Sequence, residues 1–138
     1  MTPAIERLAE LRRHVDHLRA ISSRVTDAGA LRADLSLHND VLFSLLMIAQ
    51  NVVDVASELS ARRGLRVDDY TTAVENLSAY SEFPAPLVAA LARLPGFRNI
   101  LVHEYARLDL DRVVAALHSL DPVDDFARIA AGIVADQR

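Results

Sequence analysis

The stretch that decides the fold is residues 34–64, DLSLHNDVLFSLLMIAQNVVDVASELSARRG. Leucine, alanine and valine recur in it at spacings of three and four, which is the period of an α-helix. We expect the helix to begin near Asp34 or Ser36 and to end at Gly64. Its apolar residues are too many for one ordinary core face, and a polar stripe follows the other side: Asp40, Ser44, Asn51, Asp54 and Glu58. Such a helix lies at the centre of a bundle or meets a second subunit.

Helical spacing also predicts the flanking segments, and no segment shows sustained alternation with period two. The expected landmarks are a first helix that opens at Thr2-Pro3 and is broken by TDAGA at 26–30, a third capped by Asp68 or Asp69, a fourth from near Pro86 that is interrupted at Pro95-Gly96, and a last one from near Asp109 with a kink or restart at Pro122. The sequence therefore predicts an all-α fold, an up-and-down bundle of four to five helices in one domain over residues 1–138.

Composition narrows the class of protein. Of 138 residues, 51% are hydrophobic and 25% charged, which is typical of a globular domain with a real core. There is no cysteine, so disulfides, thiolate zinc sites and cysteine nucleophiles are excluded. The first twenty residues are charged throughout, unlike a signal peptide, and the apolar stretch 41–56 is interrupted by polar residues and too short to span a bilayer. We expect a soluble, cytoplasmic protein without a membrane segment.

The charge balance gives no general sign of nucleic-acid binding. The formal net charge is −4, whereas proteins that hold nucleic acid tightly through its phosphates usually carry a broad basic surface. All 15 basic residues are arginine. An anion site in this chain would therefore use guanidinium groups, whose planar fork fits phosphate well.

The segment GFRNILVHEY, residues 96–105, concentrates polar side chains around an apolar centre. On a helix at about 100° per residue, Arg98 and Tyr105 fall on nearly the same line, and Asn99 and His103 share the neighbouring face. We expect the long arginine to reach over Val102 toward the imidazole. The segment therefore predicts a site with a fixed positive charge, a proton-exchanging group and a phenol.

These groups meet the needs of RNA cleavage without a metal ion, since histidine transfers protons near neutral pH and arginine stabilises charge on the phosphate. Pro95-Gly96 also places Arg98 near a helix N-terminus, which favours an anion. One histidine per chain leaves the acid or the base missing, and a twofold dimer would supply it. On spacing alone, a surface patch or a satisfied buried cluster explains the same residues better.

Other polar groups indicate no cofactor or metal. His14 and His17 are three apart and form at most half a metal site, because no further ligands follow at matching spacing. Asp68-Asp69 and Asp124-Asp125 read as charge at helix N-termini. Asp54 belongs equally well to the polar stripe or to the arginine–histidine site.

The run RNILVHEY resembles the signature of the HepT-type HEPN ribonuclease toxins, an arginine, four residues, a histidine, one residue and a tyrosine. MIAQNVVDVASELSARRGLR, residues 47–66, resembles the long second helix of that family, which carries an aspartate where Asp54 stands. YTTAVENLSAY and the stretch from residue 91 to residue 117 resemble the rest of it. The resemblance covers nearly the whole chain.

The resemblance implies a HEPN-fold homodimer with the motif lining a cleft between protomers, acting as an endoribonuclease toxin of a toxin–antitoxin pair. Arg98 would bind phosphate and His103 act as acid and base, with Asn99 and Asp54 in support. The implied partners are substrate RNA and an MntA-type minimal nucleotidyltransferase, which adds AMP to Tyr105 and assembles with the dimer. The alternatives are a catalytically inert helical module that binds the nucleotidyltransferase, and a nucleotide-binding HEPN domain.

Overall fold

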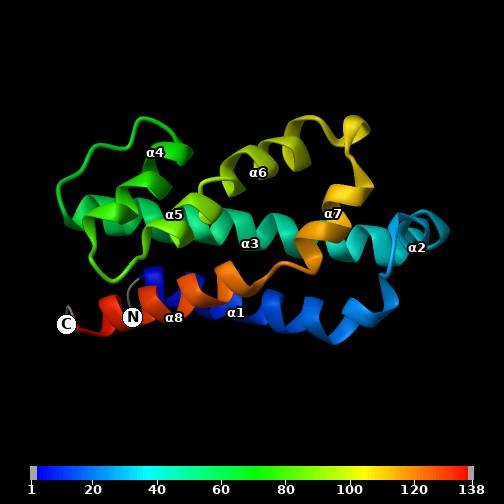
Figure 1. The fold of residues 1–138 in the computed structure, drawn as a ribbon, viewed down its shortest axis with the longest axis horizontal. Helices are drawn as coiled ribbons and strands as arrows, with labels where there is room; N and C mark the ends of the chain where they lie inside the picture. The colour runs from blue at the N-terminus through cyan, green and yellow to red at the C-terminus, as the bar shows by residue number, and fades with distance from the viewer. Residues whose placement is uncertain (1–2, 137–138) are drawn as a thin grey trace.

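Helix α3 runs through the middle of the molecule, and the other helices pack along it (Figure 1). The computed structural model describes residues 3–136, apart from the side chain of Tyr105, and these residues form helices and turns without a strand. The all-α prediction is confirmed. In chain order the elements are α1 (Pro3–Ile21), η1 (Ser22–Arg24), α2 (Ala28–Ala33), α3 (Leu35–Arg62), α4 (Tyr70–Glu75), η2 (Asn76–Ala79), α5 (Ala85–Leu91), α6 (Leu94–His103), η3 (Tyr105–Arg107), α7 (Leu110–Leu117) and α8 (Asp121–Asp136), where η denotes a short 3-10 helix.

Local signals fix both ends of α3. The Asp34 carboxylate accepts a hydrogen bond from the backbone N–H of Leu37 at 3.1 Å, which caps the first turn. At the other end Gly64 has φ of +67°, the left-handed conformation that glycine adopts without strain. Both predicted boundaries are confirmed.

The predicted central position of α3 is also confirmed. Val52, Val53, Val55 and Ala56 are all fully buried, so the helix is covered on more than one side. Its 28 residues are long and apolar enough to cross a membrane, but 61% of the most apolar window is buried inside the molecule. This burial identifies α3 as the core helix of the bundle.

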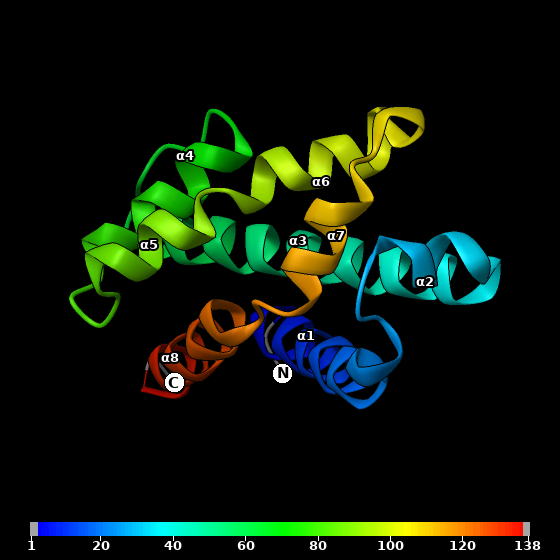
Figure 2. The same ribbon diagram turned by 45° about the vertical axis from the view of Figure 1, so that its right-hand side comes forward.

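The molecule has two layers beside α3. Figures 1 and 2 show α1 and α8 together on one side, with α4, α5 and α6 on the other. α7 crosses from the end of the second layer back to α8, and the predicted restart at Pro122 is found in the first turn of α8. This arrangement leaves the outer face of α6 uncovered in the monomer.

Two predicted breaks differ from the structure. The TDAGA segment contains a short helix of its own, α2, because Asp27 caps it by accepting from the Ala30 N–H at 3.0 Å. The interruption between α5 and α6 lies at 92–93, one turn ahead of the predicted position. A continuous helix would need an N–H from Pro95 to the Leu91 carbonyl, so the chain breaks in the preceding turn and Pro95 lies in the first turn of α6.

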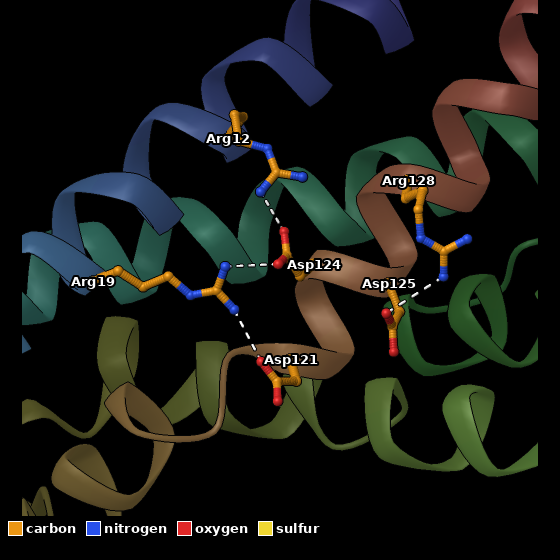
Figure 3. A network of polar contacts seen from close by, with 6 residues as sticks. All are labelled: Arg12, Arg19, Asp121, Asp124, Asp125 and Arg128. Carbon is orange, nitrogen blue, oxygen red and sulfur yellow. Dashed lines mark hydrogen bonds and ion pairs between the residues drawn. The ribbon is translucent and has the colours of Figure 1, made fainter.

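An ionic network joins α1 to α8 (Figure 3). Arg19 donates to Asp124 at 2.6 Å and to Asp121 at 3.0 Å, and Arg12 also pairs with Asp124. The hydrogen bond from Arg19, followed by that from Arg12, holds the pKa of the Asp124 carboxyl below its usual value. We call these four residues the α1–α8 staple. Asp121 and Asp124 are acidic residues of the first turn of α8. Asp124 also connects this helix to α1 through its two ion pairs.

Candidate functional site

The polar motif lies on α6 and on the turn that follows it. α6 ends at His103, where Glu104 leaves the helical region with φ −127° and ψ 33° while its N–H still bonds to the Ile100 carbonyl at 3.0 Å. Tyr105 begins the separate turn η3. The prediction of a continuous helix with Arg98 and Tyr105 on one line is therefore wrong, and the side chain of Tyr105 lies outside the described part of the structure.

Arg98 is held by both neighbouring helices. Its Nε donates to Oε1 of Gln50 on α3 at 2.7 Å, and its Nη1 donates to Oδ1 of Asn99 at 3.3 Å. The guanidinium carbon lies 5.1 Å from the centre of the Tyr70 ring at the start of α4, within the range of a cation–π contact. These contacts use part of the five N–H donors of the guanidinium, so others remain to receive an anion.

The structure corrects the expectation that Arg98 lies beside the free amides at a helix N-terminus. The helix begins at Leu94, so Arg98 is one turn inside it, and the Phe97 N–H already bonds to the Arg93 carbonyl at 3.2 Å. The free amides of the first turn therefore precede Arg98. Any anion held here depends mainly on the guanidinium.

A hydrogen-bonded relay connects Arg98 to the first helix. Gln50 donates through Nε2 to Oδ1 of Asp54 at 2.9 Å, and Nη1 of Arg7 lies 2.7 Å from the other oxygen of Asp54. The predicted supporting residue Asp54 thus reaches Arg98 only through Gln50. Sequence reasoning missed Gln50 and Tyr70 as partners of Arg98. The available signal for Gln50 was its position four residues before Asp54, on the same side of α3.

His103 is exposed at the C-terminal end of α6. Within the described part of the chain, no hydrogen bond joins it to Arg98, whose guanidinium turns toward α3 and α4 instead. Five residues correspond to about 140° around a helix, so the two side chains diverge. The expectation that the arginine crosses Val102 to the imidazole is wrong for a single protomer. Asn99, by contrast, contacts Arg98 by accepting from its Nη1.

Another cluster resembles a hydrolase triad in its order of groups. Oε1 of Glu10 lies 3.0 Å from Nε2 of His14, and Nδ1 of His14 lies 2.9 Å from Oγ of Ser44. Ser44, however, is only 2% exposed in the middle of α3, so no substrate can reach its hydroxyl. His17 pairs separately with Asp40 at 2.9 Å. The two histidines therefore join α1 to α3 and do not converge on a metal.

Comparison with known proteins gives matches along almost the entire chain. Residues 5–130 match the family model described as Ribonuclease HepT-like. The mRNA nuclease HepT of Shewanella oneidensis is 25% identical to this chain over 128 residues, which cover 88% of this chain and 91% of that protein.

Solved structures show the same fold. A tri-AMPylated Shewanella oneidensis HEPN toxin in complex with MNT antitoxin gives a TM-score of 0.81 at 23% identity, covering 96% of this chain and 99% of that one. A toxin–antitoxin structure with AMP-PNP gives a TM-score of 0.79 at 22% identity, covering 94% and 99%. The predicted HEPN architecture is confirmed by these two similarities.

Proposed function

Because the chain belongs to the HepT-like ribonuclease family, we propose that it is the toxin of a toxin–antitoxin pair and cleaves RNA phosphodiester bonds without a metal ion. The observation that carries the proposal is the setting of Arg98. Two hydrogen bonds and an aromatic ring orient its guanidinium, yet it keeps free donors on the same helix as the exposed His103. Preorganised charge of this kind is what a phosphoryl transition state requires.

The chemistry assigns one task to each group. His103 removes the proton of the ribose 2′-hydroxyl, and the 2′-oxygen attacks the adjacent phosphorus. Arg98 stabilises the negative charge that builds on the phosphoryl oxygens. The bond to the 5′-oxygen breaks, and that oxygen takes a proton from a second imidazolium. The products are a 2′,3′-cyclic phosphate and a 5′-hydroxyl.

A homodimer would provide the second imidazolium and bring the diverging residues of two copies together. Large apolar side chains remain exposed in the monomer, including Leu35 at 71%, Phe43 at 56% and Val102 at 41%. The first two lie on α3, and Val102 lies between Arg98 and His103 on α6. The exposure of these apolar side chains supports a twofold interface beside the motif, in which a second copy would bury them. Light scattering should give twice the mass of 15.2 kDa.

The proposed control acts on Tyr105. The related Shewanella oneidensis toxin is AMPylated in complex with MNT antitoxin, and we assign the corresponding partner of this chain to the minimal nucleotidyltransferases. An AMP group two residues after His103 adds negative charge and bulk where the RNA phosphate must approach. Intact mass after co-expression should increase by whole AMP units, and Tyr105→Phe should abolish the increase.

Expression of the chain alone tests the catalytic proposal. We expect growth arrest and RNA degradation, both lost in Arg98→Ala and in His103→Ala. Arg13→Ala and His17→Ala are matched controls, because both residues lie on α1 and pair with Glu10 and Asp40, outside the motif. Circular dichroism and dimer mass should be unchanged in all four variants. Full activity in both motif variants would overturn the catalytic assignment and leave an inert module that binds the nucleotidyltransferase.

A further inference from the structure

A cavity of about 670 Å³ opens between α6 and the start of α7. Its walls include Arg93, Phe97 and Ile100 from α6 and its cap, together with Arg107 and Arg112. The volume falls within the range of pockets that hold small ligands, roughly 300 to 1,000 Å³. Neither the proposed chemistry nor the control at Tyr105 uses this cavity.

Positive charge dominates the cavity. Arg93 and Arg107 form no ion pair among the described residues, and Arg112 is 3.9 Å from Asp109, the one carboxylate in the lining. That carboxylate is already engaged, because it caps α7 by accepting from the Asp111 N–H at 3.0 Å. In a chain of net charge −4, three arginines and a single acidic residue in the lining of one cavity indicate an anionic ligand.

The floor of the cavity is apolar. Phe97 is half-buried against the hydrophobic core, and Ile100 stands beside it one turn further along α6. An aromatic ring and several arginines in one lining suit a ligand with both a flat base and a phosphate, because bases stack on aromatic side chains while guanidinium forks bind phosphate. A nucleotide unit combines these two groups.

The cavity lies next to the motif on the same helix. Ile100 precedes His103 by three residues, which is about 60° around the helix axis and about 4.5 Å along it. A strand whose scissile phosphate lies at His103 can therefore place a neighbouring nucleotide in the cavity. We propose that this cavity is a subsite for a nucleotide of the substrate RNA, with its phosphate on Arg93 and Arg112 and its base against Phe97. The proposal rests on the ribonuclease function and extends it.

Direct RNA binding tests the subsite apart from cleavage. The probe is a fluorescent single-stranded oligoribonucleotide with 2′-O-methyl groups, which cannot be cleaved because the attacking hydroxyl is blocked. We expect the double variant Arg93→Ala/Arg112→Ala to bind it about tenfold more weakly and to lower the slope of log affinity against log salt by about 1.4. The control Arg13→Ala/Arg128→Ala removes two exposed arginines of α1 and α8. It should leave both values unchanged.

A second variant separates base stacking from charge. Phe97→Leu keeps the apolar floor but removes the ring, and should weaken binding about fivefold without changing the salt slope. Steady-state cleavage by the Arg93→Ala/Arg112→Ala protein should show a raised KM with kcat nearly unchanged.

The outcomes distinguish the two proposals. If the wild type cleaves RNA and the Arg93→Ala/Arg112→Ala variant binds the probe as tightly as the wild type, the subsite is overturned and the ribonuclease function stands. Loss of antitoxin binding with unaltered RNA affinity would instead make the cavity a protein docking site. A wild-type protein that neither binds nor cleaves RNA would overturn both proposals.

Discussion

Replacement of Asp124 by asparagine should remove the central negative charge of the α1–α8 staple and one of its two acceptor oxygens. Asp124 accepts from Arg12 and Arg19, which lie about two turns apart on α1, and its side chain is 30% exposed. Hydrogen bonds to charged groups contribute roughly 1.5 to 3 kcal/mol, and exposed ion pairs roughly 0.2 to 1 kcal/mol. The guanidinium groups are about two-fifths exposed, so the interaction is partly screened. We expect the free energy of unfolding to fall by about 1 to 2 kcal/mol.

This loss should depend on pH in a defined direction. Hydrogen bonds from Arg19 and Arg12 lower the pKa of Asp124 in the folded state, so its contribution is complete above the unfolded pKa of about 3.9. It disappears as the pH falls through the lower folded pKa. The difference between wild type and Asp124→Asn should therefore be constant from about pH 7 to pH 5 and should shrink below about pH 4.

Urea unfolding at several pH values measures both the loss of free energy of unfolding and its dependence on pH. In thermal unfolding near neutral pH, the melting temperature of Asp124→Asn should be about 3 to 8 °C below that of the wild type. Asp125→Asn is the matched control, because its one ion pair among the described residues is with the exposed Arg128 of the same helix, as Figure 3 shows. It should cost less than about 0.5 kcal/mol. Equal losses in the two variants, or a loss at Asp124 that persists unchanged below about pH 3, would refute the reasoning.

Three further changes probe the relay, the core and a helix end. Gln50→Leu should lower kcat/KM for RNA about tenfold while the Arg98 side chain loses its acceptor, and an unchanged value would exclude a positioning role for Gln50. Phe126→Ala should lower the free energy of unfolding by about 3 to 5 kcal/mol in urea, because the ring is completely buried, and a cost below about 1 kcal/mol would contradict its core position. Gly64→Ala should cost about 1 to 2 kcal/mol through its positive φ alone, since nothing lies within 4 Å of the added methyl. A stabilised protein would refute that explanation.

Boundaries that depend on neighbouring residues were predictable from the sequence. The caps at Asp34 and Asp69 and the glycine at the end of α3 act within a few residues, so their chemistry is visible in the linear order. The end of α6 at His103 was not predicted, because neither glycine nor proline marks it. The placement of Tyr105 in η3 instead of α6 was missed for the same reason.

The partners of Arg98 could not be predicted for a different reason. Gln50 and Tyr70 contact Arg98 only after α3, α4 and α6 have packed together. Contacts between residues so distant in the chain leave no spacing pattern from which they could be predicted. The motif itself was recognisable because its spacing is local. The orientation of its arginine depends on tertiary structure, and the roles assigned to Arg98, Asn99, His103 and Asp54 stay predictions.

The relay from Arg7 through Asp54 and Gln50 to Arg98 joins the first helix of the chain to one of the last. Contacts between residues so far apart in sequence are costly in chain entropy and depend on the completed arrangement of helices. A chain still emerging from the ribosome has made Arg7 and Gln50 long before Arg98 exists. The arginine of a nascent or partly unfolded chain is therefore unoriented, and its guanidinium is held in place only when synthesis and folding are complete.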